Sequence, residues 1–307
     1  MEKKIGKKNA LRKQWPFWLM ILPGMLYLLI NNYGPMSGLF IAFKKIDYGK
    51  GIWDSPWVGF DNFTYLFKTS AAFEITRNTI LYNLAFIVVG TVMGIAVGIM
   101  LSELRSKAKT KFFQTVILLP YLLSWVICAY IGYAFLSKET GLINNILGYF
   151  GINGVDWYND PSKWPMILLL INTWKGLGYS AIIYMSTIIG IDHSLYESAM
   201  VDGATKWKQI WYITIPMLKS TVIMLVIMSV GRMFYSDFGL FYQMPMNSGS
   251  LFGVTQTIDT YVYRALMQQN DVAMSSAAGF YQSIVGFVLV LTANAIVRKL
   301  SPEDAMF

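Results

Sequence analysis

The sequence has little of the chemistry that most catalytic and metal sites require. Its 307 residues include one cysteine, Cys128, and one histidine, His193. A single cysteine excludes an internal disulfide and a cysteine-rich metal site, and a single histidine excludes a histidine cluster made by this chain alone. No G-x-x-x-x-G-K-[ST] segment occurs, so there is no phosphate-binding loop of an ATPase. We therefore expect a protein that is not an enzyme and holds no cofactor of its own.

Charged residues are also scarce. They make up 14% of the chain, against 55% hydrophobic residues and a mean hydropathy of +0.46, which is too apolar for a soluble globular domain of this size. The net charge of +8 comes from Lys and Arg at the edges of apolar runs, not on one face of a fold. This placement indicates membrane topology and argues against a nucleic-acid partner. The sequence predicts an all-α integral membrane protein surrounded by lipid.

A helix crosses the hydrocarbon core of a bilayer with about 20 apolar residues. The sequence contains six such runs, at residues 15–33, 79–101, 112–136, 164–189, 213–235 and 276–297. The first run extends toward Phe43 across Gly34-Pro35, where we expect a break. In the second run Gly90, Gly94 and Gly98 recur every four residues, which predicts a helix face that packs closely against a neighbour.

Positively charged loops stay on the cytoplasmic side of a membrane. Lys and Arg are concentrated before residue 15, between the second and third runs, and after the last run at Arg298-Lys299. Both termini are therefore predicted to be cytoplasmic. Residues 1–14 would form a basic cytoplasmic tail, 15–297 a transmembrane domain with a cytoplasmic loop at 191–212, and 298–307 a C-terminal cytoplasmic tail.

The loop at 191–212 is the most informative segment. Ser194 and Glu197 have the S-x-x-E spacing of a capping box, so a short helix is expected to begin there. Ala199 and Gly203 lie four residues apart, which would place both on one side of that helix and leave a smooth strip for another protein. A solvated connector without a partner is the alternative interpretation.

The run Glu197-Ser198-Ala199-x-x-Asp202-Gly203-Ala204, followed by Ile213-x-x-Pro216, resembles the EAA loop of binding-protein-dependent ABC importer permeases. Ser198 departs from the family, which usually has a second alanine there. The resemblance implies the type I permease fold and a coupling helix seated on a cytoplasmic ATPase. Glu197 and Asp202 would be its charged contacts, and Ala199, Gly203 and Ala204 would give the close fit.

Three further segments, at 34–36, 55–63 and 258–264, resemble permeases of the complex-carbohydrate importers, of the maltose type. This resemblance implies a permease subunit in a bacterial cytoplasmic membrane that translocates an oligosaccharide. Its partners would be a second permease subunit, two ATPase domains that bind ATP and magnesium, and an extracellular solute-binding protein that delivers the carbohydrate.

A charge inside a membrane is costly, so each one needs a reason. Lys175 lies in the middle of the fourth run, within a polar stretch that contains two glycines, whereas Arg232 is expected to lie near the outer end of the fifth run and to extend to the interface. Aromatic rings and amides suit a sugar path, although packing and interfacial anchoring are the alternative for each residue. The expected path comprises Asn83, Tyr130, Trp174, Lys175, Tyr179 and Tyr235.

Two other functions remain open at this point. An ABC permease for a non-sugar solute would share the EAA loop. An ion-coupled secondary transporter would need carboxylates within its spans, but Glu103 and Asp237 lie only at the ends of the predicted runs.

Overall fold

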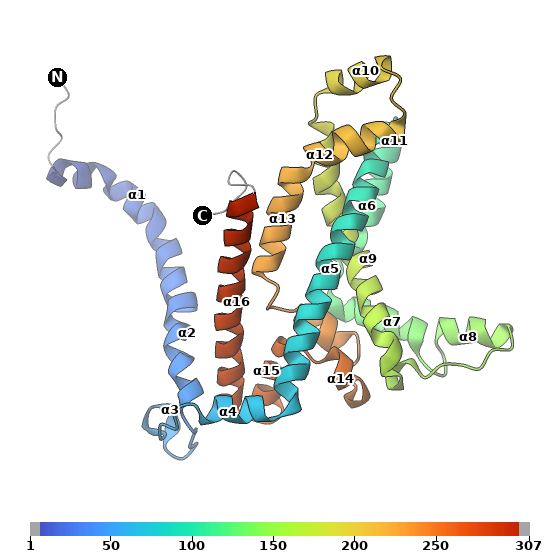
Figure 1. Ribbon diagram of the computed structural model, residues 1–307. Helices are drawn as coiled ribbons and strands as arrows, with labels where there is room; N and C mark the ends of the chain where they lie inside the picture. Colours follow the sequence, from blue (N-terminus) through green and yellow to red (C-terminus); the bar gives the residue numbers. More distant parts are fainter. Residues whose placement is uncertain (1–6, 301–307) are drawn as a thin grey trace.

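Long helices that run side by side set the architecture of the protein (Figure 1). The computed structural model describes residues 7–300, so the outer parts of both predicted tails, 1–6 and 301–307, lie outside the described residues. Within 7–300 the chain is helical and contains no β-strand, only an isolated bridge between Lys44 and Trp57. The long helices are α1 (Lys7–Leu28), α5 (Ser70–Ser102), α6 (Lys107–Leu122), α7 (Trp125–Leu136), α9 (Trp164–Ile189), α13 (Lys219–Gly231) and α16 (Val272–Leu300).

Shorter helices connect the long ones. They are α2 (Gly34–Met36), α3 (Gly51–Asp54), α4 (Asp61–Lys68), α8 (Leu142–Tyr149), α10 (His193–Val201), α11 (Lys206–Gln209), α12 (Ile215–Met217), α14 (Phe252–Thr255) and α15 (Ile258–Met267). Wider π-helical turns occur at Leu29–Tyr33, Ile210–Thr214 and Gly239–Gln243.

Four of the six predicted spans are continuous helices that are long and apolar enough to cross a membrane. They are Trp15–Phe43, Ser70–Ser102, Pro161–Ile189 and Val272–Lys299. The other two predicted spans, 112–136 and 213–235, are each formed by a bent pair of helices. Helices α6 and α7 meet at 97°, and the segment Lys206–Met217 meets α13 at 55°.

The breaks follow from local sequence. Pro120 lies in the last turn of α6 and cannot donate a backbone hydrogen bond, and Ser124 then caps α7 by accepting from the amide of Ile127. In the fifth span Pro216 follows the π turn Ile210–Thr214. The described chain therefore has six spans only if each bent pair counts as one.

The first span continues through Gly34-Pro35 without the expected break. A π turn at Leu29–Tyr33 leads directly into α2, where Pro35 occupies the first turn and needs no hydrogen-bonded amide. The helical path then runs to Phe43. The α1 part of this span stands apart from the other helices in Figure 1, and none of the span's most apolar window is buried, whereas Phe43 at its end packs against Phe280 of α16.

Helices α5 and α9 pack closely because glycines remove side chains from their contact. A Cβ on Gly94 would lie 2.9 Å from Cβ of Ser180, and one on Gly98 would lie 3.0 Å from the carbonyl oxygen of Ala181. The predicted packing face is confirmed at these two positions. Gly90, by contrast, has open space beside it.

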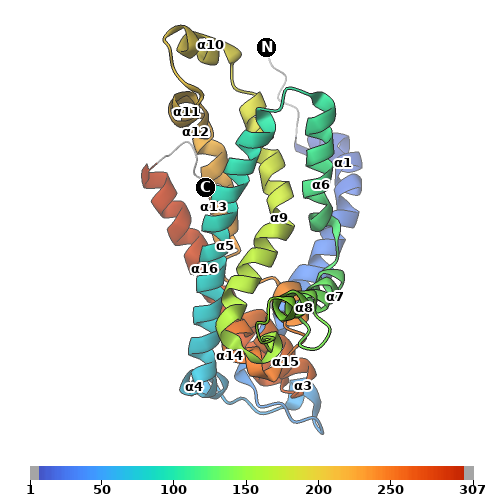
Figure 2. The ribbon, with the colours of Figure 1, turned by 90° about the vertical axis from the view of Figure 1, so that its right-hand side faces the viewer.

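The two ends of the bundle differ. Helices α10 and α11 lie at the same end as the start of α1 and the end of α16, whereas α3, α4, α14 and α15 gather at the opposite end (Figures 1 and 2). Figure 2 shows α10 projecting beyond the long helices. We call these the α10 end and the outer end. Both ends of the described chain thus lie on the same side of the bundle.

Candidate functional site

Helix α10 falls within the predicted loop, but its start differs from the prediction. The N-cap is Asp192, whose Oδ1 accepts a hydrogen bond from the amide of Ser194 at 2.9 Å. This bond stabilises the carboxylate and lowers the pKa of Asp192. The helix begins at His193, so the capping box of Ser194 and Glu197 was wrong. An aspartate two residues earlier took the cap, which leaves the Glu197 side chain exposed on the first turns.

The end of α10 also corrects the sequence interpretation. Gly203 has φ of +74° and lies beyond the last helical residue. Its amide bonds to the carbonyl of Met200, and the amide of Ala204 bonds to the carbonyl of Ala199 at 2.8 Å, the pattern of a Schellman motif. Gly203 therefore terminates the helix and does not share a strip on its surface with Ala199.

Helix α10 has no buried residue. Leu195 is 40% exposed, Met200 55% and Val201 89%, which is a high apolar exposure for one short helix at the end of a bundle. Acidic Glu197 and Asp202 are exposed beside them. An exposed helix with apolar and acidic groups is suited to contact with another protein.

Two contacts join the loop to the spans. The hydroxyls of Tyr196 and Thr214 lie 2.9 Å apart, and Nζ of Lys206 lies 2.9 Å from Oε2 of Glu103, the residue that follows α5. Between these contacts lies a cavity of about 200 Å³ that also includes His193. A displacement of α10 would therefore reach α5 through Lys206 and the fifth span through Tyr196.

A second site lies halfway between the two ends. A pocket of about 290 Å³, here called the central pocket, is formed by α5, α9 and the segment after α13. Phe86 is the midpoint of the 33-residue helix α5, so the pocket lies about halfway along this span. Its lining is Asn83, Phe86, Ile87, Asn172, Ser229, Arg232, Tyr235 and Asp237.

Lys175 lies near the middle of α9, as expected, and its side chain contacts the neighbouring helix break. Its Nζ donates to the carbonyl oxygens of Pro120 at 3.2 Å, Tyr121 at 3.0 Å and Leu123 at 2.6 Å. These carbonyls lie at the break between α6 and α7, where the helix ends and its last acceptors lose their partners. The ammonium group thus satisfies the broken backbone inside the membrane.

Trp125 connects this break to the central pocket. Its Nε1 donates to Oδ2 of Asp237 at 2.7 Å, and its ring centroid lies 5.1 Å from Nζ of Lys175. The indole lies against Gly239, where an added Cβ would be 2.2 Å from the ring. The chain Lys175–Trp125–Asp237 therefore fixes one wall of the pocket relative to the α6–α7 break.

The six residues expected on the sugar path are thus divided among three places. Asn83 and Tyr235 meet in the central pocket. Lys175 contacts the helix break, and the Tyr179 ring stacks on Tyr121 with centroids 5.0 Å apart. Tyr130 and Trp174 are 66% and 45% exposed and are not among the lining residues of the central pocket.

Sequence reasoning missed two lining residues, Arg232 and Asp237. Both were expected at the end of the fifth span, and α13 indeed ends at Gly231, but the segment that follows lines the same pocket as Phe86. The available signal was Arg232 itself, because a charged residue within or beside an apolar run is rare in membrane spans and often marks a functional site.

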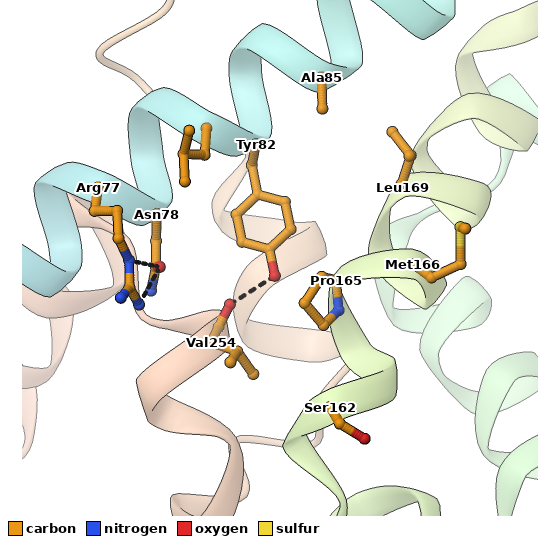
Figure 3. Close-up of a pocket in the computed structure, with 10 residues that line it drawn as sticks. Arg77, Asn78, Tyr82, Ala85, Ser162, Pro165, Met166, Leu169 and Val254 are labelled. Carbon is orange, nitrogen blue, oxygen red and sulfur yellow. Dashed lines mark hydrogen bonds between the residues drawn. The ribbon is translucent and has the colours of Figure 1, made fainter.

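A larger pocket of about 650 Å³ lies nearer the outer end, between α5, α9 and α14 (Figure 3). Its polar groups already have partners. The hydroxyl of Tyr82 donates to the carbonyl of Val254 at 2.8 Å, and the amide of Asn78 donates to the carbonyls of Gly253 and Gln256. Its remaining lining is mainly apolar, which suits lipid or a packed side chain better than a sugar.

Comparison with known proteins agrees with this geometry. Residues 90–302 match the family of binding-protein-dependent transport system inner membrane components. The permease YteP of the polygalacturonan/rhamnogalacturonan transport system of Bacillus subtilis (strain 168) is 34% identical over 304 residues, covering 98% of this chain and 94% of YteP. Protein LplB of the same organism is 31% identical over 301 residues and covers 98% of this chain and 94% of LplB.

Solved structures show the same fold. A chain in the crystal structure of a bacterial ABC transporter involved in import of the acidic polysaccharide alginate has a TM-score of 0.87 and 32% identity, covering 95% of this chain and 98% of that one. A second structure, of an alginate transporter with an alginate pentasaccharide-bound periplasmic protein, has a TM-score of 0.86 and 32% identity, with coverage of 95% and 97%. The chain therefore belongs to the family of inner membrane components of binding-protein-dependent transport systems, with the type I ABC permease fold, and is a membrane permease of the kind found in carbohydrate importers.

Proposed function

We propose that this permease carries an oligosaccharide through its central pocket, and that a separate ATPase seated on α10 drives the movement. The exposed helix α10 is the observation that carries this proposal. It presents Glu197 and Asp202 with the small residues Ala199 and Ala204, and the left-handed turn at Gly203 sets where the helix ends. ATP and magnesium would bind to the ATPase and not to this chain.

The cargo is proposed from both the pocket and the relatives. The central pocket offers amides from Asn83 and Asn172, hydroxyls from Ser229 and Tyr235, and the ring of Phe86. Such groups bond sugar hydroxyls and stack on the apolar face of a sugar ring. The names of YteP and of the two alginate transporters describe saccharide transport.

A second permease subunit would complete the membrane assembly. The α1 part of the span Trp15–Phe43 stands apart from the bundle, and none of the span's most apolar window is buried. Lipid satisfies an apolar helix, but helix packing and interhelical contacts hold membrane subunits together. We propose that this span lies against the second permease, and that the central pocket becomes a closed path only in that pair.

The α10 end would face the cytoplasm, so both termini would be cytoplasmic. Arg105, Lys107, Lys109 and Lys111 follow α5 at this end, as expected for cytoplasmic loops. The outer end would receive a solute-binding protein loaded with the saccharide. One of the two alginate transporter structures is a complex with an alginate pentasaccharide-bound periplasmic protein.

The test is purification of this chain with the other subunits encoded beside it, followed by ATPase and uptake assays in proteoliposomes. A complex with a second permease and an ATPase, stimulated by a saccharide-loaded binding protein, is the expected result. Uptake that requires an ion gradient and no ATP would contradict the proposal.

A further inference from the structure

Arg232 is a cation in the wall of the central pocket. Helix α13 ends at Gly231, and Arg232 is the first residue of the irregular segment that follows. It lines the central pocket together with Phe86, the midpoint residue of α5. A charge at this depth is costly and is typical of a functional group in a water-filled pathway. Anchoring at the membrane interface therefore does not account for the position of Arg232.

Within residues 7–300 the Arg232 side chain has neither a hydrogen bond nor a salt bridge with the protein. The carboxylate of Asp237 lines the same pocket, but it accepts from Nε1 of Trp125 at 2.7 Å and from the amide of Leu240 at 3.3 Å. The carboxylate of Asp237 thus already accepts hydrogen bonds that position Trp125 and the turn that begins at Gly239. The pocket therefore holds one cation and one carboxylate, and within residues 7–300 the carboxylate already has hydrogen-bond donors whereas the guanidinium donors of Arg232 have no acceptor.

The geometry points to Arg232 as the residue that selects saccharides bearing a carboxylate, of the uronate type. A guanidinium group offers two parallel N–H donors that match the two oxygens of a carboxylate. The neighbouring amides and hydroxyls of Asn83, Asn172, Ser229 and Tyr235 suit the remaining hydroxyls of the sugar. The inference rests on the proposed function, because it names the class of saccharide that passes the same pocket.

A purely structural role for Arg232 makes a different prediction. A cation after the last turn of α13 also interacts favourably with the negative end of that helix. Any cation would serve there, and its loss would affect every saccharide alike. The selective role requires the planar pair of donors and affects only acidic saccharides.

The experiment uses the complete importer in proteoliposomes with its binding protein. The probes are oligogalacturonate and the neutral galacto-oligosaccharide made by reducing its carboxyl groups. We expect the wild type to take up oligogalacturonate, and Arg232→Gln to lose at least tenfold of that uptake. Arg232→Lys, which keeps the charge but not the two parallel donors, should recover only part of it. Lys219→Gln removes a positive charge from the opposite end of the same helix and should leave uptake unchanged.

ATPase activity without binding protein, together with the elution profile of the complex, reports whether each variant assembles. Wild-type uptake of oligogalacturonate in assembled Arg232→Gln, or equal losses for acidic and neutral probes, would overturn the selective role. Wild-type uptake of the neutral probe in preference to the acidic one would overturn it too, while supporting the proposed function. Failure of the wild type to transport any saccharide would instead remove the proposed function itself.

Discussion

The Nζ of Lys175 lies 2.6 Å from the carbonyl oxygen of Leu123, in the two-residue gap between α6 and α7. It also donates to the carbonyls of Pro120 and Tyr121, of which the Pro120 carbonyl accepts from the amide of Leu123 as well. We predict that Lys175→Met lowers the stability of the folded chain by about 2–4 kcal/mol, since unsatisfied groups in a membrane cost several kcal/mol.

Thermal unfolding of the purified complex, followed by tryptophan fluorescence, measures this effect. Lys175→Arg keeps donors at the position and should lose less than Lys175→Met. An unchanged melting temperature for Lys175→Met with normal uptake would show that the carbonyls find other partners.

Two glycines on α9 form a matched pair. A Cβ on Gly178 would lie 2.1 Å from the carbonyl oxygen of Ile117 in α6, whereas a Cβ on Gly176 has nothing within 4 Å. Gly178→Ala should destabilise the chain by about 1–3 kcal/mol or more, because α6 must move away. Gly176→Ala should be neutral or stabilising by up to about 1 kcal/mol. Equal melting temperatures for the two variants would contradict this contact.

Gly203 gives a test of the turn after α10. Its φ of +74° is rare for side chains other than asparagine and aspartate, and costs about 1–2 kcal/mol for other residues. Gly203→Val should lower saccharide-stimulated ATPase activity and uptake severalfold, while Gly203→Asn should retain most of both. Subunit yield checks that each variant assembles. If valine and asparagine behaved alike, the turn would not be the reason for glycine at this position.

The ion pair of Lys206 with Glu103 links the loop to α5. Its side chains are 65% and 50% exposed, so the pair is worth at most about 1 kcal/mol. Lys206→Glu places two negative charges together and should reduce uptake by about fivefold or less, with a smaller loss at high salt. The exchange Glu103→Lys with Lys206→Glu should recover uptake. No recovery in this double variant would mean that the two residues act separately.

Much of the fold could be predicted from hydropathy because membrane helices need long apolar runs. Residues 164–189 were predicted as a span and form α9 with those bounds. The EAA-like loop was likewise placed correctly on an exposed helix. The caps of that helix were not, because Asp192 and Ser194 are both good N-cap residues and sequence spacing cannot rank them; the side chain of Asp192 accepts from the amide of Ser194 and so takes the cap.

Tertiary contacts explain the remaining errors. The break after α6 is stabilised by Lys175, which lies more than fifty residues away in the chain. No local pattern connects these positions, so the bend within the span predicted at 112–136 could not be predicted from the sequence. The same limit applied to Arg232, whose depth depends on where α13 stops.

Helix α5 has a mechanical consequence. Its 33 residues extend about 50 Å at 1.5 Å per residue, more than the roughly 30 Å of hydrocarbon in a bilayer, and Ser70–Ser102 contains neither proline nor a π turn. Glu103, just past one end, pairs with the loop around α10, and near the other end Asn78 bonds the carbonyls of Gly253 and Gln256. The helix therefore acts as a stiff lever, so that a small tilt imposed at one membrane surface must displace the outer loops at the other.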